Sequence, residues 1–279
     1  MRRRDDWLPT LLATGSLGLA LLMTPAALSG QEETAVPSYA DTVEGLERRD
    51  GFLTTFLDHE KGAVWIEIPA SAREEPLEML YVEGLVSGLG SNPVGLDRGQ
   101  LGETRLVRLR PVGGKLLVEQ VNLGYRALSE NAAERRAVET SFATSVLWAG
   151  PIAARSDDGA ALVDFTSFVV RDAHDVVATL KRTEQGAFRL DPERSAVDLE
   201  ACLVFPDNVE LEAVLTFAGD APGDHVRSTA PTGEAVTLVQ HHSLIRLPDD
   251  GYEPRAFDPR AGNFAIAFAD YATPLDEPL

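Results

Sequence analysis

Short turns join successive apolar segments of this sequence, and this feature most restricts the folds open to it. Such turns, rich in Gly, Asp or Ser, separate three pairs of segments: 52–57 and 63–68, 104–109 and 115–121, and 146–154 and 160–170. Parallel neighbours need a crossover of about a dozen residues or more, whereas antiparallel neighbours can be joined by a tight turn. The pattern therefore predicts three antiparallel hairpins.

Further strands and a few helices are predicted between and after these hairpins. Apolar residues alternate with polar ones at 197–205 and 209–215, and other strands are expected at 79–86, 236–247 and 264–268. Asn131 and Asp172 are suitable caps for helices over 132–142 and 172–181. Residues 88–102 form a glycine-rich loop, and 219–234 another loop. We expect an α+β fold, β-dominated, with mostly antiparallel sheets and two or three short helices.

The first 29 residues have the features of a secretory signal peptide. Arg2, Arg3 and Arg4 precede a run without charge from residue 8 to 28, and Ala27-Leu28-Ser29 places small residues at a cleavage site. The alternative is an uncleaved membrane anchor, since about 20 apolar residues can span a bilayer. Pro9 and Pro25 favour cleavage. We therefore predict a secreted or periplasmic protein with no membrane contact beyond the signal peptide.

Composition changes divide the remainder into three parts. Residues 30–45 are polar and aperiodic, which predicts a flexible arm. Residues 46–87 are expected to form a small N-terminal β module, and 88–279 a larger α+β domain. The net charge of −19 repels phosphate backbones, so no nucleic-acid partner is expected. Cys202 is the only cysteine, so the chain forms no internal disulfide.

The histidines form none of the catalytic motifs that we considered. His59-Glu60-Lys61-Gly62-Ala63 has Ala63 where a His-Glu-x-x-His zinc helix needs its second histidine. His241 and His242 are neighbours on a predicted strand, so they point to opposite faces and cannot easily share a metal. His174 follows Asp172, where we expect a hydrogen bond at the helix cap rather than a ligand role. An enzyme built from carboxylates alone is left as a further alternative.

Several segments together resemble the N-terminal regions of secreted bacterial zinc-dependent metalloprotease-like proteins of the met-zincin type. The resemblance covers nearly all of residues 45–279 and rests on Gly51-Phe52, Val64-Trp65-Ile66-Glu67-Ile68-Pro69, the glycine loop 87–102, residues 131–139, Ser145-Val146-Leu147-Trp148, Arg171-Asp172-Ala173-His174, residues 191–197, Gln240-His241-His242-Ser243, residues 247–252, Phe257-Asp258-Pro259-Arg260 and residues 270–277. In that family, such regions precede a catalytic domain that bears the His-Glu-x-x-His helix.

The resemblance implies a zinc metallopeptidase family, but its catalytic residues have no positions here to which they could be assigned. We therefore expect this chain to be inactive alone, to hold no cofactor itself, and to be a fragment of a longer protein or an orphaned module. Zinc is expected in the downstream protease domain, which would be the main partner, beside an extracellular protein substrate. The region would serve as a pro-region or accessory domain.

Two smaller predictions concern named side chains. Asp97, Arg98 and Gln100 in the glycine loop are candidates for organising the fold or contacting the protease domain, and local turn hydrogen bonds are the alternative. Cys202 could plug a zinc ion as a pro-region thiolate, although a half-buried thiol in a strand is favoured. If the chain is free-standing, we expect an extracytoplasmic binding module for protein or glycan, with the glycine loop as its recognition surface.

Overall fold

The computed structural model describes residues 38–90, 93–249, 251, 253, 255, 258–262 and 267–272. The predicted signal peptide lies outside these residues. All of these described residues belong to one compact unit. No helix in the described part of the chain is long and apolar enough to cross a membrane.

All three predicted hairpins are present. Strands β2 (Thr55–Asp58) and β3 (Ala63–Ile68), β5 (Arg105–Val112) and β6 (Lys115–Gln120), and β8 (Ser145–Arg155) and β9 (Ala161–Asp164) form antiparallel pairs. The third hairpin is shorter than expected. Its second strand ends at Asp164, and Thr166–Val169 form helix α3 instead of continuing the strand. The Asp164 carboxylate accepts a hydrogen bond from Thr166 N–H, which helps to start that turn.

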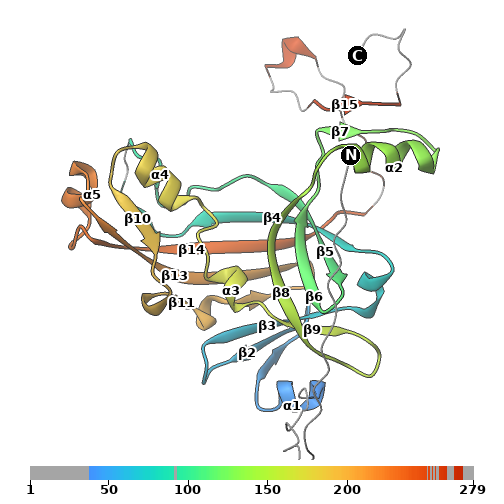
Figure 1. The fold of residues 1–279 in the computed structure, drawn as a ribbon, viewed down its shortest axis with the longest axis horizontal. Helices are drawn as coiled ribbons and strands as arrows, with labels where there is room; N and C mark the ends of the chain where they lie inside the picture. Colours follow the sequence, from blue (N-terminus) through green and yellow to red (C-terminus); the bar gives the residue numbers. More distant parts are fainter. Residues whose placement is uncertain are drawn as a thin grey trace, which may run out of the picture. The chain divides into compact units, whose positions relative to one another are not determined.

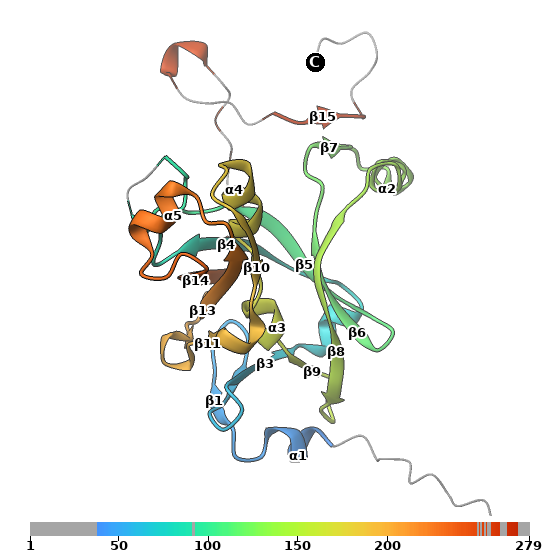
Figure 2. The ribbon, with the colours of Figure 1, turned by 60° about the vertical axis from the view of Figure 1, so that its left-hand side comes forward.

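The hairpins belong to one curved sheet (Figures 1 and 2). Its order is β1-β2-β3-β9-β8-β6-β5-β4-β14-β13-β10, with β11 and β12 also paired to β13. The remaining strands are β1 (Glu47–Arg49), β4 (Leu77–Leu85), β10 (Ala187–Leu190), β11 (Ala196–Val197), β12 (Leu203–Val204), β13 (Asn208–Asp220) and β14 (Ala235–Arg246). Because β4 pairs with both β5 and β14, the sheet runs unbroken across the predicted boundary at residue 88.

The described residues contain five α-helices, more than the two or three expected. They are α1 (Tyr39–Val43), α2 (Ala132–Ser141), α3, α4 (Val176–Arg182) and α5 (Asp224–Thr229). Asn131 caps α2 as predicted, because its side chain accepts a hydrogen bond from Ala133 N–H. Asp172 accepts from the first two residues of α4, although the helix starts four residues later than expected. The fold is therefore β-dominated and mostly antiparallel, with short helices.

Two helices lie in segments that the sequence predicted to be an arm and a loop. Helix α1 falls within the expected arm 30–45, where Ser38 and Asp41 form a capping box. Helix α5 falls within the expected loop 219–234. Its N-cap residue, Gly223, has no side chain to cap it, and Gln185 from another segment accepts hydrogen bonds from its first turn instead. These hydrogen bonds come from a residue distant in the sequence, so the segment itself carries no pattern that would predict the helix.

The strand predicted at 197–205 is interrupted. Within this segment two short strands, β11 and β12, pair with β13, and Leu199–Ala201 between them form a 3₁₀ turn. The Asp198 carbonyl accepts hydrogen bonds from Ala201 N–H and the Cys202 thiol, which fixes the turn. Other 3₁₀ turns lie at Ala70–Arg73, Pro192–Arg194 and Pro259–Ala261. Residues 264–266 of the strand predicted at 264–268 lie outside the described part.

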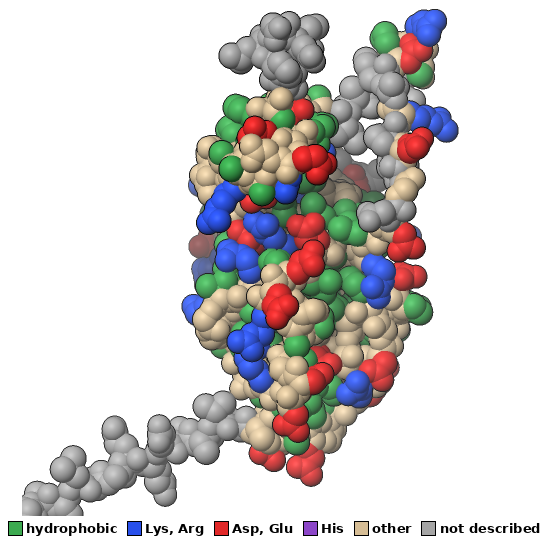
Figure 3. All heavy atoms as spheres, turned by 90° about the vertical axis from the view of Figure 1, so that its right-hand side faces the viewer, with side chains coloured by type: hydrophobic (Ala, Val, Ile, Leu, Met, Phe, Trp, Pro, Cys, Tyr) green, Lys and Arg blue, Asp and Glu red, His purple; other side chains and the backbone are tan. Residues whose placement is uncertain are grey.

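A two-stranded sheet lies apart from the main sheet. Strand β7 (Tyr125–Arg126) pairs in parallel with β15 (Ala269–Asp270), and α2 contacts β7. Figure 3 shows one face of the molecule, on which acidic, basic and hydrophobic side chains are interspersed. The acidic excess on that face is therefore not gathered into a single patch.

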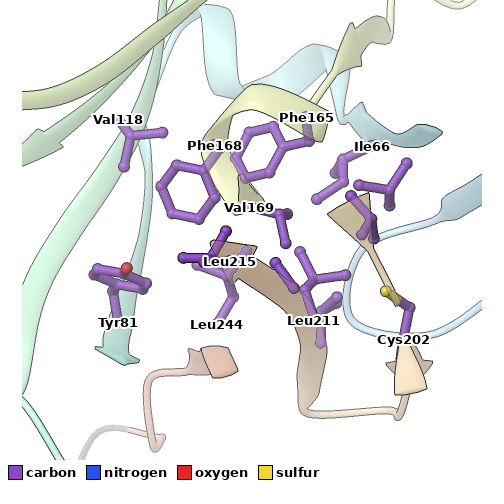
Figure 4. Close-up of a cluster of buried hydrophobic side chains, with 14 of the residues drawn as sticks. Ile66, Tyr81, Val118, Phe165, Phe168, Val169, Cys202, Leu211, Leu215 and Leu244 are labelled. Carbon is purple, nitrogen blue, oxygen red and sulfur yellow. The ribbon is translucent and has the colours of Figure 1, made fainter. Parts of the chain in front are cut away.

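The core fills the inner side of the curved sheet. Phe165 and Phe168 at α3 point into it with ring centroids 4.5 Å apart, and aliphatic side chains of β13 and β14 lie beneath them (Figure 4). Tyr81 of β4 stands beside Phe168 at 5.4 Å. Burial of this apolar surface is the main stabilising contribution, at about 25 cal/mol per Å² removed from water. The core therefore fixes α3, and α3 in turn positions the loop that leads to α4.

Candidate functional site

Adjacent histidines of β14 lie on opposite sides of the sheet, as predicted. His242 is fully buried on the inner face, opposite Glu83 of β4 in the strand register. His241 lies on the outer face, where about a third of its side chain is exposed. Two clusters of polar side chains have formed around these residues, one on each side of the sheet, and both are candidates for a functional site.

The inner cluster holds His242 in its neutral form. The Tyr81 hydroxyl lies 2.9 Å from His242 Nδ1, and the Val169 carbonyl lies 3.1 Å from Nε2. Because a carbonyl only accepts, the contact with Val169 requires the ring proton on Nε2, and Nδ1 then accepts from Tyr81. The Gln240 amide nitrogen also lies 2.9 Å from Nε2, but with the proton there two donors face each other and this contact is not a hydrogen bond. Burial, and secondarily the positive charge of Arg171, lower the pKa of His242 to about 3.

Gln240 connects this histidine to the loop before α4. Its Oε1 accepts hydrogen bonds from the backbone N–H groups of Ala173 at 3.0 Å and His174 at 3.1 Å. Its Nε2 donates to the Arg171 carbonyl at 2.9 Å. The Arg171 guanidinium donates to the Tyr81 hydroxyl at 2.7 Å and lies over the Phe168 ring. One side chain of β14 therefore fixes the backbone of residues 171–174.

This fixed loop presents His174 to a buried carboxylate. His174 Nδ1 lies 2.6 Å from Glu83 Oε2, and Arg105 Nη1 lies 3.6 Å from Glu83 Oε1. The side chains of Glu83 and His174 are only 2% and 7% exposed. The prediction that the His174 side chain forms a hydrogen bond in the helix cap is therefore wrong. Asp172 caps α4 by itself, and the imidazole is oriented by β4 instead.

A pocket opens beside the Glu83–His174 pair. Glu103, Arg105 and Asp175 also line it. Gly102 lines it too, and a Cβ at that position would overlap the Glu83 carboxylate, so a larger residue there would have to displace that side chain. An imidazole oriented by a carboxylate can move a proton or bind a ligand through its second nitrogen.

The outer cluster surrounds His241. Its Nδ1 lies 2.9 Å from Glu212 Oε1, and its Nε2 lies 2.5 Å from Glu210 Oε2. The Ser243 hydroxyl donates to the same Glu210 carboxylate. The hydrogen bond with Glu210 raises the pKa of His241 against the opposing effect of partial burial. Burial alone would raise the pKa of Glu210, but its hydrogen bonds, the one from His241 first, lower it.

This combination of serine, histidine and glutamate does not form a nucleophilic triad. A triad needs a histidine nitrogen that accepts the serine proton. Here both nitrogens of His241 face carboxylates, and the hydroxyl of Ser243 donates to Glu210. The arrangement stabilises an imidazolium between two acids and thereby ties β13 to β14.

A second pocket of about 290 Å³ lies over the outer cluster. Its floor includes His241 and Ser243, and its rim includes Arg98 and Leu101 from the glycine loop. Leu101 is 72% exposed. The three loop residues predicted from the sequence, Asp97, Arg98 and Gln100, therefore have different roles. Arg98 faces this pocket, whereas Asp97 N–H donates to Gln100 Oε1 at 3.1 Å within the turn.

Cys202 lies inside the core. It is 1% exposed, its thiol donates to the Asp198 carbonyl at 3.3 Å, and burial raises its pKa to about 11. A zinc plug needs an accessible thiolate, so the contacts of Cys202 favour the structural alternative. Within the described residues, no group of three or more His, Cys, Asp or Glu side chains is arranged to hold a metal ion.

Sequence reasoning did not identify most members of the inner cluster. Glu83 follows the inward-facing residues Met79 and Tyr81 at two-residue spacing, so its phase on β4 was a readable signal of a buried carboxylate. Arg171 and Gln240 gave no such signal, because Arg171 donates to the Tyr81 hydroxyl and Gln240 bonds the backbone of residues 171–174, and both partners are distant in the sequence.

Comparison with protein families identifies the family to which the chain belongs. The model of a family described as a domain of unknown function, DUF5117, matches residues 99–278, which is more than half of the sequence. The chain belongs to the DUF5117 family. The DUF5117 match begins within the glycine loop, so it includes Arg171, His174 and His242 but not Tyr81 and Glu83. No curated protein and no solved structure matched the chain. The description of DUF5117 names no activity, and the resemblance to metalloprotease-like proteins stays a prediction.

Proposed function

We propose that this chain is a non-catalytic N-terminal region, a pro-region or accessory domain, of an exported zinc-dependent metalloprotease-like protein. The resemblance over residues 45–279 supports this assignment, and the leader supports a secreted or periplasmic location. The partner would be the protein's own protease domain, which would hold the zinc. The substrate of that domain would be an extracellular protein.

The observation that carries the proposal is the engagement of the histidines. His242 is buried and neutral with contacts at both ring nitrogens, and His241 is held between two carboxylates. Each of these contacts joins one strand or loop to another. Residues whose ring nitrogens serve such contacts stabilise a fold, and this favours a binding or covering role over a catalytic one.

Two measurements test the proposal. The genomic DNA that follows the codon for Leu279 is expected to encode a His-Glu-x-x-His motif in the same frame. Purified residues 30–279 are expected to bind no stoichiometric zinc and to leave casein intact. The longer protein should bind zinc and cleave casein. Stoichiometric zinc together with casein cleavage by residues 30–279 alone would refute the non-catalytic assignment.

The outer pocket favours a second candidate, a free-standing binding module for protein or glycan. Its rim brings together an exposed cation at Arg98 and an exposed apolar side chain at Leu101. Charged and apolar groups around a concave surface are typical of ligand sites. An in-frame stop directly after Leu279 would support this candidate. Its test is a loss of binding to extracellular proteins or glycans in an Arg98→Ala variant, with Arg194→Ala as the exposed control.

A further inference from the structure

An exposed aromatic cluster surrounds the small β7–β15 sheet. We call it the β7 patch and define it by Leu123, Tyr125, Leu128, Phe142, Val146, Phe268 and Tyr271. Figures 1 and 2 show that β7, α2 and β15 lie together, apart from the curved sheet. Six of these seven residues are between 38% and 64% exposed. Only five other large apolar residues in the described part of the chain are comparably exposed.

The β7 patch is ordered by contacts between its own rings. Tyr125 stacks on Phe142 with centroids 3.8 Å apart and planes 1° from parallel, and Tyr271 lies 5.3 Å from Phe142. Arg126 lies 4.2 Å over the Phe268 ring. Rings held in place before binding lose little conformational freedom when a partner covers them.

Backbone hydrogen bonds fix the C-terminal part of the patch to the rest. Tyr271 N–H donates to the Arg126 carbonyl at 2.7 Å, and Leu128 N–H donates to the Asp270 carboxylate at 3.0 Å. Residues 267–272 therefore belong to the same surface as β7, although 142 positions separate Leu128 from Asp270. Exposed clusters of large apolar side chains are typical of interaction surfaces, and Tyr is enriched where binding energy concentrates.

We propose that the β7 patch is the docking surface for a folded protein domain joined to the C-terminal end of this chain. This inference rests on the proposed function, which identifies that domain as the zinc protease domain. Tyr271 lies within the patch, and residues 273–279 can extend at most about 25 Å. A domain beyond Leu279 is therefore held next to these rings at a high effective concentration.

Charge argues against the other occupants of the patch. Two copies of this chain, each with a net charge of −19, repel each other, which disfavours self-association through the patch. The same charge repels nucleic acid. A neutral or basic domain tethered next to the patch meets no such barrier, and the aromatic rings then supply the apolar contact.

The test uses the longer protein and compares three variants with the wild type. The double variant Tyr125→Ser/Tyr271→Ser removes the outer rings, and Tyr125→Phe/Tyr271→Phe retains them. The matched control, Leu203→Ser/Phe205→Ser, changes two side chains that are 45% and 44% exposed near β12. The readout is the rate at which thermolysin cuts residues 273–279 in the native protein. Far-UV circular dichroism checks that each variant is folded.

Docking shields the connecting segment, so the serine variant should be cut roughly tenfold faster than the wild type. The phenylalanine variant and the control should be cut at the wild-type rate. Should the serine variant unfold, Leu128→Ser, which lies outside the ring stack, replaces it. A serine variant that is cut no faster than the control overturns the docking inference and leaves the proposed function intact. A dimer that the serine variant dissociates also overturns it, and an in-frame stop after Leu279 overturns both proposals.

Discussion

Lowering the pH should reduce the free energy of unfolding of this protein, because His242 is buried in its neutral form. The buried ring binds a proton in the unfolded chain, where its pKa is about 6.5, but resists protonation in the fold, where its pKa is about 3. Protonation would place a proton on Nδ1, which faces the Tyr81 oxygen at 2.9 Å. That oxygen already accepts from Arg171, and the hydroxyl proton of Tyr81 would lose its acceptor.

The sign and size of the effect follow from these two pKa values. Below a pH of about 6.5 the unfolded state binds more protons at this site than the folded state, so stability falls as the pH falls. At a pH of about 5 the difference is 1.5 pH units, and 1.36 kcal/mol per unit gives a loss of about 2 kcal/mol. At a pH of about 7.5 the loss is close to zero.

Urea unfolding at both pH values measures this loss. The variant His242→Gln removes the titrating group, so its stability should fall by about 2 kcal/mol less than that of the wild type between the two conditions. His59→Gln is the matched control, because His59 lies in an exposed turn with its ring 48% accessible. The reasoning is refuted if wild type and His242→Gln lose the same free energy of unfolding between the two conditions.

Three other perturbations test contacts of individual buried groups. Glu119→Gln removes the charge of a carboxylate that is 6% exposed and bound by two arginines, which are 26% and 39% exposed, so urea unfolding should show a loss of about 1.5 kcal/mol. Gly102→Ala should displace the Glu83 carboxylate and cost more stability than Gly113→Ala, whose added Cβ meets nothing within 4 Å although its positive φ is strained. Cys202 should react with a thiol reagent only after unfolding, and fast labelling of the native protein would contradict its burial and raised pKa.

The sequence predicted those parts of the fold that local signals specify. Tight turns identified three hairpins, and the side chain of Asn131 identified the start of α2. The adjacency of His241 and His242 was enough to place them on opposite faces, because side chains alternate along a strand. Each of these predictions depends on residues that are neighbours in the chain.

The parts that were missed depend on distant partners. Helix α5 is capped by Gln185, and the loop 171–174 is fixed by Gln240, so neither has a pattern of its own. The Glu83–His174 pair joins residues 91 positions apart. A propensity or a period describes one segment at a time, whereas these contacts are set by the order in which the strands pair.

The two histidines of β14 should together produce a stability maximum. His241 binds its proton more tightly in the fold than in the unfolded chain, so its contribution is fully present below a pH of about 6.5 and is lost as the pH rises through its raised pKa. His242 has the opposite preference, and its contribution is lost as the pH falls below about 6.5. His241 is held between two carboxylates, whereas His242 is buried and lies near the partly buried Arg171, so one strand contains two opposing titrations. Together they favour the fold most strongly near a pH of about 6.5, with stability falling on both sides.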